Sequence, residues 1–421
     1  MKASVYLLIP LLLFMLLVDI YTYRGVKPLI ARIKYSPARQ SLSILFWGIS
    51  VLVFAGFTLF MFGIKHVQQS ETYIYVGYLV AGFSLFYIPK FVFVLFVLLK
   101  DILGAIAGII NWFGERKKKS VPQFNSKRKM ERSEFLYQMG LILAAIPFAS
   151  ILYGVTKGKF NYRVMREKIS FDHLPKSFKG LKIVQISDMH LGSFNKNFEK
   201  ITKAVELINE QEPDLILFTG DLVNNFAEET EGWAPILSKM NAKIGKYSIM
   251  GNHDYGDYSY WKSPADKAQN LQTIKDFHHE MGFKLLLNES ETISLNGEEI
   301  ALVGVENWGK PPFPQHGDLQ KAINGSANLP FKILMSHDPS HWDAQVLDTD
   351  IALTFSGHTH GMQFGLERAG IKWSPVQYKY PRWGGLYQQG NQYLYVNRGF
   401  GYIGFPGRVG MPPEITLVEL T

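Results

Sequence analysis

A short apolar stretch followed at once by an aspartate and a histidine lies near the middle of the chain: LKIVQISDMH, residues 181–190. The run LKIVQIS, with its β-branched residues, predicts a buried strand, and Asp188-Met189-His190 comes directly after it. A two-residue step along an extended segment points two side chains the same way. Asp188 and His190 are therefore candidate partners in one site.

The same arrangement recurs after four further predicted strands. The strand DLILFT is followed by Gly220-Asp221, YSIM by Gly251-Asn252-His253-Asp254, FKILM by Ser336-His337-Asp338, and IALTF by Ser356-Gly357-His358-Thr359-His360. Ligand sites in α/β sheets lie at the carboxyl ends of strands, so we expect these side chains to meet. Carboxylate, imidazole and amide groups together suit Zn, Fe, Mn or Co. One such strand end is an ordinary polar loop, but five in succession predict a metal site.

The rest of the C-terminal part alternates strands with helices and then becomes rich in strands. Helical spacing is clearest over 196–209 and 266–281. This order predicts an α/β sandwich with partly mixed sheets. Cysteine chemistry is excluded because the chain has no cysteine. A serine nucleophile is disfavoured because no G-x-S-x-G follows a strand, and neither common nucleotide-binding glycine motif is present.

With all five blocks in place, residues 180–421 resemble the calcineurin-like metallophosphoesterase superfamily, whose pattern is D-x-H, G-D, G-N-H-D/E, H and G-H-x-H. The resemblance implies an α/β-β/α sandwich that binds two divalent or trivalent ions of Mn, Zn or Fe. The implied ligands are Asp188, His190, Asp221 and His360 for one ion, and Asp221, Asn252, His337 and His358 for the other. Asp221 would bridge the two ions.

The resemblance also implies a catalytic role for His253 and Asp254. A hydroxide activated by the two metals would attack phosphorus in line. His253, which binds no metal, would stabilise the phosphoryl oxygens or protonate the leaving group, and Asp254 would hold its ring. Met362 stands where relatives often carry glycine, which changes the pocket wall rather than the ligands.

Four apolar stretches precede this domain, at residues 3–21, 42–64, 73–99 and 135–155. Each is near the roughly 20 residues needed to cross a bilayer. We therefore expect an α-helical transmembrane anchor over 1–155, a linker over 156–179 and the metallophosphoesterase domain over 180–421. Buried core helices are the alternative, and Pro147 makes that alternative strongest for the fourth stretch. The whole resembles the transmembrane branch of the superfamily.

The net charge of +8 divides unevenly along the chain. Residues 1–170 hold 22 Lys and Arg against 7 Asp and Glu, a net of +15, and the remainder holds 22 against 29, a net of −7. The segments before the spans carry 1, 5, 1 and 9 basic residues in turn. By the positive-inside rule the two richer loops are cytoplasmic, which places the catalytic domain outside. The basic cluster over 157–168 opposes this, and the domain is cytoplasmic if the fourth stretch does not cross.

The expected substrate is a phosphodiester, a phosphomonoester or a lipid-linked phosphate, with membrane lipid as the other partner. Aromatic residues with basic neighbours over 255–261 and 373–387 are candidates for the pocket, although ordinary packing is the alternative. Nucleic acid is disfavoured as a partner because the catalytic part is acidic, and the basic loop 114–134 is better explained by membrane orientation.

Other function classes remain open at this stage. An extracytoplasmic nuclease or nucleotide phosphodiesterase is the next hypothesis, and a non-catalytic membrane receptor with a relict phosphoesterase fold is another. A transport role for the first 170 residues is disfavoured because the pattern shows no intramembrane charge cluster. Asp19 lies near the end of its span, and Lys90 lies beside Pro89.

Overall fold

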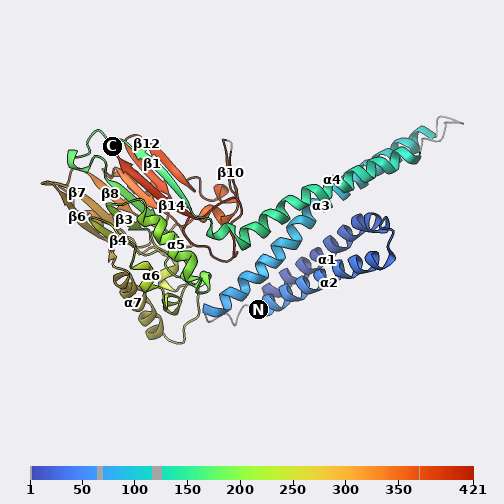
Figure 1. Ribbon diagram of the computed structural model, residues 1–421, viewed down its shortest axis with the longest axis horizontal. Coiled ribbons are helices and arrows are strands. Elements are labelled where there is room, and N and C mark those ends of the chain that lie inside the picture. The colour runs from blue at the N-terminus through green and yellow to red at the C-terminus, as the bar shows by residue number, and fades with distance from the viewer. Residues whose placement is uncertain (1, 64–69, 116–125, 369) are drawn as a thin grey trace. The chain divides into compact units, whose positions relative to one another are not determined.

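The computed structural model describes residues 2–63, 70–115, 126–368 and 370–421. Within these residues the chain divides into two compact units, one comprising 2–63 and 78–152 and the other comprising 70–77 and 153–421. The first unit is helical and the second contains the sheets (Figure 1). Residues 116–125 of the basic loop 114–134, including Arg116 to Lys119, lie outside the described residues.

Four long helices make up the N-terminal part of the chain: α1 (Lys2–Ala31), α2 (Ser36–Gly63), α3 (Ser70–Glu115) and α4 (Ser126–Thr156). Each contains a segment long and apolar enough to cross a membrane, namely Ile9–Ala31, Ser36–Leu59, Tyr75–Phe113 and Glu134–Thr156. The four predicted spans are therefore present as helices. The fourth is helical through Pro147.

Two of the predicted span ends are wrong. Helix α1 continues to Ala31, so much of the predicted loop 22–41 is helical. Helix α3 continues sixteen residues beyond the predicted end at Leu99 and runs through Pro89 without a break. Its apolar segment of 39 residues is about 58 Å long at 1.5 Å per residue, well beyond a hydrocarbon core of about 30 Å.

A buried polar cluster lies inside the helical unit, which corrects the expectation that there is none. The Lys90 ammonium lies 2.5 Å from Asp19 Oδ1, and the Tyr87 hydroxyl donates to Asp19 Oδ2 at 2.8 Å. Ser50 donates to Asp19 at 3.1 Å and accepts from Lys90 at 2.9 Å. Sequence position suggested that Asp19 and Lys90 lie apart, but the packing of α1, α2 and α3 brings them together. We call these four residues the anchor cluster.

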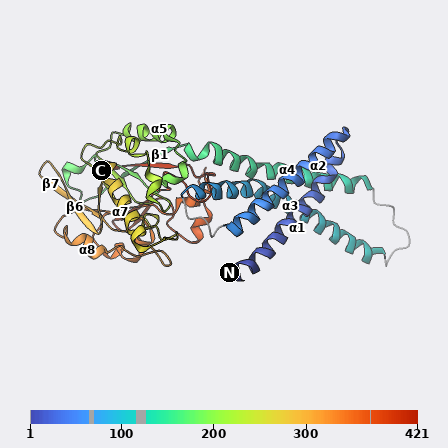
Figure 2. The same cartoon turned by 90° about the horizontal axis from the view of Figure 1, so that it is seen from below.

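Two six-stranded sheets form the C-terminal domain (Figures 1 and 2). The first, in the order β1-β14-β2-β3-β4-β5, contains β1 (Arg163–Ile169), β14 (Glu414–Leu420), β2 (Lys182–Ile186), β3 (Leu215–Phe218), β4 (Gly245–Ser248) and β5 (Lys284–Leu285). The second, in the order β12-β13-β9-β8-β7-β6, contains β12 (Gly385–Gln389), β13 (Gln392–Val396), β9 (Leu353–Ser356), β8 (Lys332–Met335), β7 (Glu298–Gly304) and β6 (Glu289–Leu295). A separate hairpin pairs β10 (Leu366–Arg368) with β11 (Ile371–Trp373).

Three apolar layers hold this domain together. Ile183 and Leu217 of the first sheet pack with Ile333 and Phe355 of the second, so the two sheets lie face to face. The outer face of the first sheet is covered by α5 (Phe198–Asn209), α6 (Ala234–Leu237) and α7 (Pro264–Glu280), and that of the second by α8 (Leu319–Asn324) and α9 (Ser340–Ala344). The predicted α/β-β/α sandwich with mixed sheets is confirmed.

The segment 156–179, predicted as a linker, instead contributes a strand to the first sheet. β1 pairs in parallel with β14 from Arg163 to Ile169. Its basic residues have partners within the domain: Arg166 donates to Gln211 at 2.7 Å, and Lys168 pairs with Glu419 at 3.0 Å. The alternating burial along β1 is that of an edge strand, and the sequence pattern there is too polar to signal it.

Candidate metal centre

All the predicted ligands follow strands that run in parallel. Strands β2, β3 and β4 are adjacent and parallel in the first sheet, and β8 and β9 are adjacent and parallel in the second. Their carboxyl ends meet at one edge of the sandwich, where every predicted ligand is well shielded from solvent. The expectation that five strand ends converge is therefore met by the geometry.

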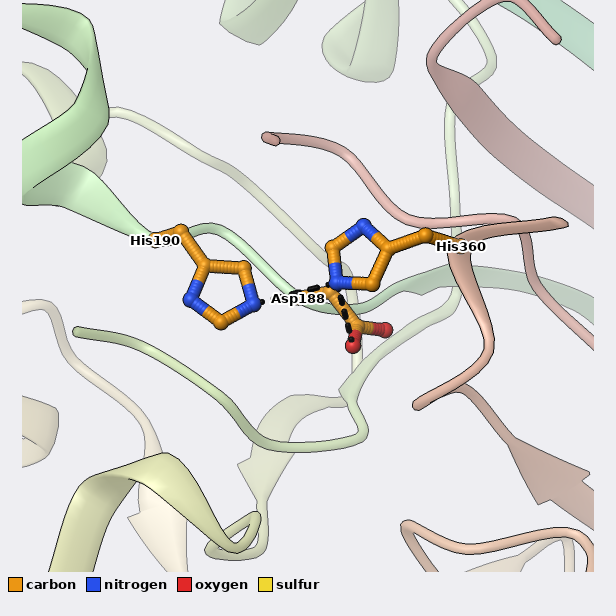
Figure 3. Close-up of side chains that lie close together, drawn as sticks. All are labelled: Asp188, His190 and His360. Atoms are coloured by element: carbon orange, nitrogen blue, oxygen red, sulfur yellow. Dashed lines mark hydrogen bonds and ion pairs between the residues drawn. The ribbon is translucent and has the colours of Figure 1, made fainter. Parts of the chain in front are cut away.

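The first cluster consists of Asp188, His190 and His360, all buried (Figure 3). His360 Nε2 lies 3.2 Å from Asp188 Oδ1 and 3.1 Å from His190 Nε2. Their ligand atoms all lie within 4.8 Å of one another. Two imidazole nitrogens and a carboxylate oxygen directed at one point form a site that a cation of Zn, Fe or Mn type fits.

The second cluster consists of Asp221, His337 and His358. Asp221 Oδ2 lies 3.1 Å from His337 Nε2 and 3.7 Å from His190 Nε2 of the first cluster. Asn252 adjoins the second cluster, since its Oδ1 lies 2.9 Å from His358 Nδ1. The carboxylate of Asp221 therefore faces both clusters, which is the place that a bridging ligand occupies.

Five of these residues adopt a left-handed backbone conformation, which is uncommon for residues other than glycine. The φ angles are +53° at Asp188, +48° at His190, +59° at Asp221, +69° at His358 and +51° at His360. Such conformations cost on the order of 1 kcal/mol or more each, and they persist where the surrounding structure enforces them. Their concentration at one point indicates that these strand ends are shaped for a function.

Two glycines allow the strand ends to approach the carboxylates closely. A Cβ atom on Gly357 would lie 2.3 Å from Asp188 Oδ2, and one on Gly251 would lie 2.2 Å from Asp221 Oδ1. The absence of these atoms lets the backbone N–H of His358 donate to Asp188 at 3.0 Å and that of His253 donate to Asp221 at 2.9 Å. The two carboxylates are thus held in place by backbone donors.

Backbone carbonyls set the tautomers of the histidines. His337 Nδ1 lies 2.7 Å from the carbonyl of Thr219, and His190 Nδ1 lies 3.2 Å from that of Val223. With Nδ1 donating, the lone pair of each ring is at Nε2 and points into the site. His337 Nε2 is buried and lies 3.1 Å from Asp221 Oδ2, and it has no other polar partner among the described residues. A lone pair against a carboxylate requires a cation between them, either a proton or a metal ion, so the residues fit a metal.

The charge states of these groups also suit metal binding. Burial lowers the pKa of the His190 imidazole, and it lowers the pKa of His358 to about 4. Burial raises the pKa of the Asp221 carboxyl, but the nearby imidazoles of His337 and His253 outweigh it and hold that pKa well below its usual range. Burial lowers the pKa of His337, but Asp221 outweighs it and raises the value to about 10. A metal ion would replace the proton that His337 otherwise shares with Asp221.

The ring of His253 is positioned differently from the prediction. Its Nδ1 lies 2.7 Å from the carbonyl of Asn224, not from Asp254. The Asp254 carboxylate instead accepts from the backbone N–H groups of Asp221 at 3.0 Å, Leu222 at 2.8 Å and Gly251 at 2.9 Å. Asp254 therefore ties together the two loops that carry the second cluster. A sequence motif gives no sign of which donors a buried carboxylate accepts from.

Two tyrosines and an arginine reach the site without having been predicted individually. The Tyr380 hydroxyl lies 2.8 Å from His358 Nε2, and the Tyr258 hydroxyl accepts from Asn252 at 2.9 Å. Each comes from one of the two aromatic segments proposed as pocket walls. Arg408 is fully buried, and its Nη2 lies 3.3 Å from His360 Nδ1. Nothing in the local sequence around Arg408 marks it as part of the site.

Known proteins match the part of the chain that contains these residues. Residues 181–362 match the family described as "Calcineurin-like phosphoesterase". YkuE of Bacillus subtilis (strain 168), described as an uncharacterized metallophosphoesterase, is 33% identical over 304 residues, which cover 70% of this chain and 98% of that protein. The chain belongs to the calcineurin-like phosphoesterase family. All five motif blocks of the resemblance fall between residues 181 and 362.

The membrane part of this phosphoesterase also has relatives. Residues 4–159 match the family described as "Probable Calcineurin-like phosphoesterase, transmembrane domain". A protein of Danio rerio described as "Transmembrane protein with metallophosphoesterase domain" is 30% identical over 67% of this chain and 62% of its own length. A Bos taurus protein of the same description is 27% identical over 96% of this chain and 87% of its own length. The phosphoesterase is therefore a membrane protein.

Proposed function

We propose that this protein is a membrane-anchored hydrolase of phosphoesters that works with two metal ions and acts on a lipid-linked phosphate. The position of Asp221 carries the proposal. Its carboxylate lies 3.1 Å from His337 of the second cluster and 3.7 Å from His190 of the first, so one residue reaches both candidate sites. Transition-metal ions of Mn, Zn or Fe type suit the donor set, and the choice among them is left to experiment.

The bound ions would supply a Lewis acid for the phosphoryl oxygens and an activated water. Asp188, His190 and His360 would hold one ion, and Asn252, His337 and His358 would hold the other, with Asp221 shared. The chain holds these ligands in advance, because backbone donors fix the carboxylates and backbone carbonyls fix two of the rings. Ligand geometry set before substrate arrives avoids reorganisation during the reaction.

His253 is the proposed proton donor. With Nδ1 held by the Asn224 carbonyl, its Nε2 is the ring nitrogen left to meet substrate, and the residue is partly exposed. Burial lowers the pKa of His253, which favours the neutral ring before substrate binds, and a phosphoryl oxygen bound beside it would favour the protonated form. His253 Nε2 would donate to a phosphoryl oxygen and then to the departing oxygen of the ester. Its ring also packs against Tyr258, 4.7 Å between centroids.

Three observations support a lipid-linked substrate. The anchor keeps the site close to lipid, and tethering raises the effective concentration of a substrate in the same membrane. Tyr258 and Tyr380 border the second cluster, so aromatic surface leads up to the ligands. The net charge of −7 over residues 171–421 disfavours a polyanionic nucleic acid, which leaves a nuclease as the second candidate.

A metal-loaded activity screen tests the proposal. Full-length protein purified in detergent, stripped with chelator and reloaded with Mn²⁺, Zn²⁺ or Fe²⁺, is assayed on a generic aryl phosphodiester, then on phosphomonoesters, phospholipids in mixed micelles and single-stranded DNA. We expect metal-dependent hydrolysis of the aryl ester and its loss in the Asp221→Ala variant. Equal activity of that variant refutes the two-metal proposal, and metal binding without any hydrolysis supports a receptor instead.

We also propose that the catalytic domain faces away from the cytoplasm. The alternation of basic residues between spans supports this. The basic cluster over 157–168 is weaker evidence against this orientation, because Arg166 and Lys168 have partners inside the domain. A reporter fused after Thr421 is expected to be active only outside the cytoplasm. A cytoplasmic readout overturns this orientation and favours nucleotide-linked lipids that occur on that side.

A further inference from the structure

The hairpin β10–β11 has its polar face toward the protein and its apolar face toward solvent. Leu366 pairs with Trp373 and Glu367 with Lys372, so the members of each pair share a face. Glu367 forms an ion pair with the buried Arg398 at 2.8 Å. The Lys372 ammonium donates to the carbonyl of Gly384. The charged face is therefore anchored to the domain.

The opposite face of the hairpin is largely exposed to solvent. Leu366 is 46% exposed, Ile371 is 56% exposed and Trp373 is 38% exposed. Nearby, Met362 and Tyr378 are also exposed. The hairpin directs its leucine, isoleucine and tryptophan outward, with Arg368 paired to Ile371 on the same face, while Glu367 and Lys372 bind the domain. This differs from the usual arrangement of a solvated sheet.

This hairpin begins close to the point where α4 leaves its apolar segment. That segment ends at Thr156, and its last turn belongs to the same compact unit as the catalytic domain. Arg408 N donates to the carbonyl of Gly154 at 3.2 Å, and Gly365 N donates to the carbonyl of Val409 at 2.9 Å. Two hydrogen bonds therefore separate the last turn of α4 from the residue that precedes β10.

Glycines make this contact close. A Cβ atom on Gly154 would lie 2.7 Å from the carbonyl oxygen of Arg408, and one on Gly407 would lie 3.0 Å from the Cα of Val155. Side chains at either position would push the loop 405–409 away from the helix. With the end of the apolar segment at the membrane surface, the loop and the hairpin next to it would lie at the level of the lipid headgroups.

We infer that the outward face of β10–β11, formed by Leu366, Ile371 and Trp373, docks on the lipid bilayer that holds the anchor. An apolar patch with tryptophan at headgroup level is what an interfacial contact requires, and its burial in lipid is favourable. Hydrophobic rather than electrostatic docking fits the net charge of −7 over residues 171–421. The inference does not depend on the proposed activity, because it concerns where the domain rests.

Docking would also orient the metal centre. The segment between His360 and β10 includes Gln363, whose side-chain amide donates to the carbonyl of Phe405 at 2.7 Å in the loop beside α4. Arg408 of that loop lies against His360. His360 of the first cluster is therefore in contact with the loop beside α4, so a docked hairpin would hold the site near the headgroups.

Single cysteines can be introduced without background, because the chain has none. The full-length Ile371→Cys variant is labelled with an environment-sensitive fluorophore and reconstituted in phosphatidylcholine vesicles, with and without brominated lipid. Thr292→Cys on the exposed side of β6 is the matched control, since β6 lies at the end of the domain opposite β10 (Figure 1). We expect a blue-shifted emission and at least about twofold stronger quenching by brominated lipid at position 371.

Equal, weak quenching at positions 371 and 292 overturns the inference. So does shielding of position 371 without lipid quenching but with crosslinks between copies, which assigns the face to a second copy of the chain. A Leu366→Cys label in an Ile371→Asp background keeps the inference testable, because the added charge should abolish its quenching. Hydrolysis of the soluble aryl ester, measured in parallel on Ile371→Asp, should be unchanged and separates loss of docking from loss of the proposed function.

Discussion

The anchor cluster and the metal centre both bury charged side chains, but only the anchor cluster is complete. In the anchor, Asp19 receives Lys90, Tyr87 and Ser50, so one anion meets one cation and two hydroxyl groups. In the metal centre, Asp188 and Asp221 meet histidines whose lone pairs point at the same space, and His337 Nε2 has no polar partner other than Asp221 among the described residues. The first arrangement is self-sufficient, and the second requires a cation from outside the chain.

The difference separates a structural use of buried charge from a chemical one. Inside a membrane, an unpaired charge is costly, so a closed network fixes the register of helices that apolar surfaces alone would leave free to slide. At the metal centre the ligands are held in place by strand ends and left-handed residues. Selective removal of single groups should therefore affect the two clusters in different ways.

The largest effect is expected at the metal centre. His337→Ala removes the side chain whose Nε2 faces Asp221, and it should lower kcat by about 10³-fold, on the order of 4 kcal/mol of transition-state stabilisation. Metal content, measured by mass spectrometry of the purified protein, should fall by about one ion per chain. The thermal unfolding midpoint of the helical unit should not change, because its cluster needs no metal.

His341→Gln is the matched control for this experiment. His341 is a buried histidine four residues away that contacts Ser336 and Gln345 rather than the clusters. It should retain both ions and most of the activity. Loss of metal in the control but not in the His337 variant would show that the clusters are wrongly assigned.

In the anchor, the sharpest change is Lys90→Met. It leaves the Asp19 carboxylate buried without a cation and should destabilise the helical unit by about 3 kcal/mol. The measurement is the unfolding of full-length protein by denaturing detergent, followed by helical circular dichroism. Turnover of a soluble aryl ester should be retained while the protein is folded, because the cluster lies in the other compact unit.

The double variant Asp19→Asn with Lys90→Met tests the reason for that loss. Removing both charges should restore most of the stability, since the penalty comes from the unpaired ion and not from the absent bond. If the double variant is as unstable as Lys90→Met, the cluster stabilises the helices through something other than charge pairing.

A third buried polar group lies in neither cluster. His278 on α7 lies 2.9 Å from the Ser248 hydroxyl through Nδ1, and no described residue forms a hydrogen bond with its Nε2. Burial lowers its pKa from 6.5 to about 3. The folded state therefore favours the neutral ring. The contribution of His278 to the free energy of unfolding is full above pH 6.5 and is lost as the pH falls. At pH 5 the loss is about 2 kcal/mol.

Urea unfolding of the metal-loaded protein between pH 7.5 and 5 measures the contribution of His278 to the free energy of unfolding. His278→Gln cannot titrate, so its free energy of unfolding should decline less steeply than that of the wild type over the same range. The metal-binding histidines titrate in both proteins and cancel in the difference. Identical slopes would show that the ring is protonated when folded or is reached by water.

The smallest effect is expected from Ser50→Ala in the anchor. Asp19 keeps Lys90 and Tyr87, so the network loses one hydroxyl but no charge. Interhelical hydrogen bonds of this kind contribute roughly 0.6 kcal/mol on average. Detergent unfolding should detect a shift several-fold smaller than that of Lys90→Met. A comparable shift would mean that the cluster acts as a hydrogen-bond network more than as an ion pair.

Much of the fold was accessible from local sequence. Long uncharged runs predicted four helices, and the apolar strands 181–187 and 351–355 were predicted because strands buried on both faces are continuous apolar runs. The exposed strands were missed for the opposite reason. β1 and β11 are short or edge strands with polar residues, so their pattern resembles that of a loop.

The metal centre divides in the same way. Residue types at strand ends were enough to propose Asp188, Asp221 and His337, since the side chain itself determines whether a residue can bind a metal. Which donors hold Asp254, and the approach of Arg408 to His360, were not predictable, because these contacts join residues far apart in the chain. A local sequence pattern does not reveal a contact between residues that become neighbours only when the chain folds.

Sequence alone therefore established the spans, the alternation of strands and helices, and the identity of the candidate ligands, because each depends on the residues themselves and their immediate neighbours. Three-dimensional packing established the rest: that Asp19 meets Lys90, that five strand ends share one edge with Asp221 facing both clusters, and that a hairpin turns its apolar side outward. Those features depend on which distant segments lie together, and that is settled by the burial of surfaces across the whole chain.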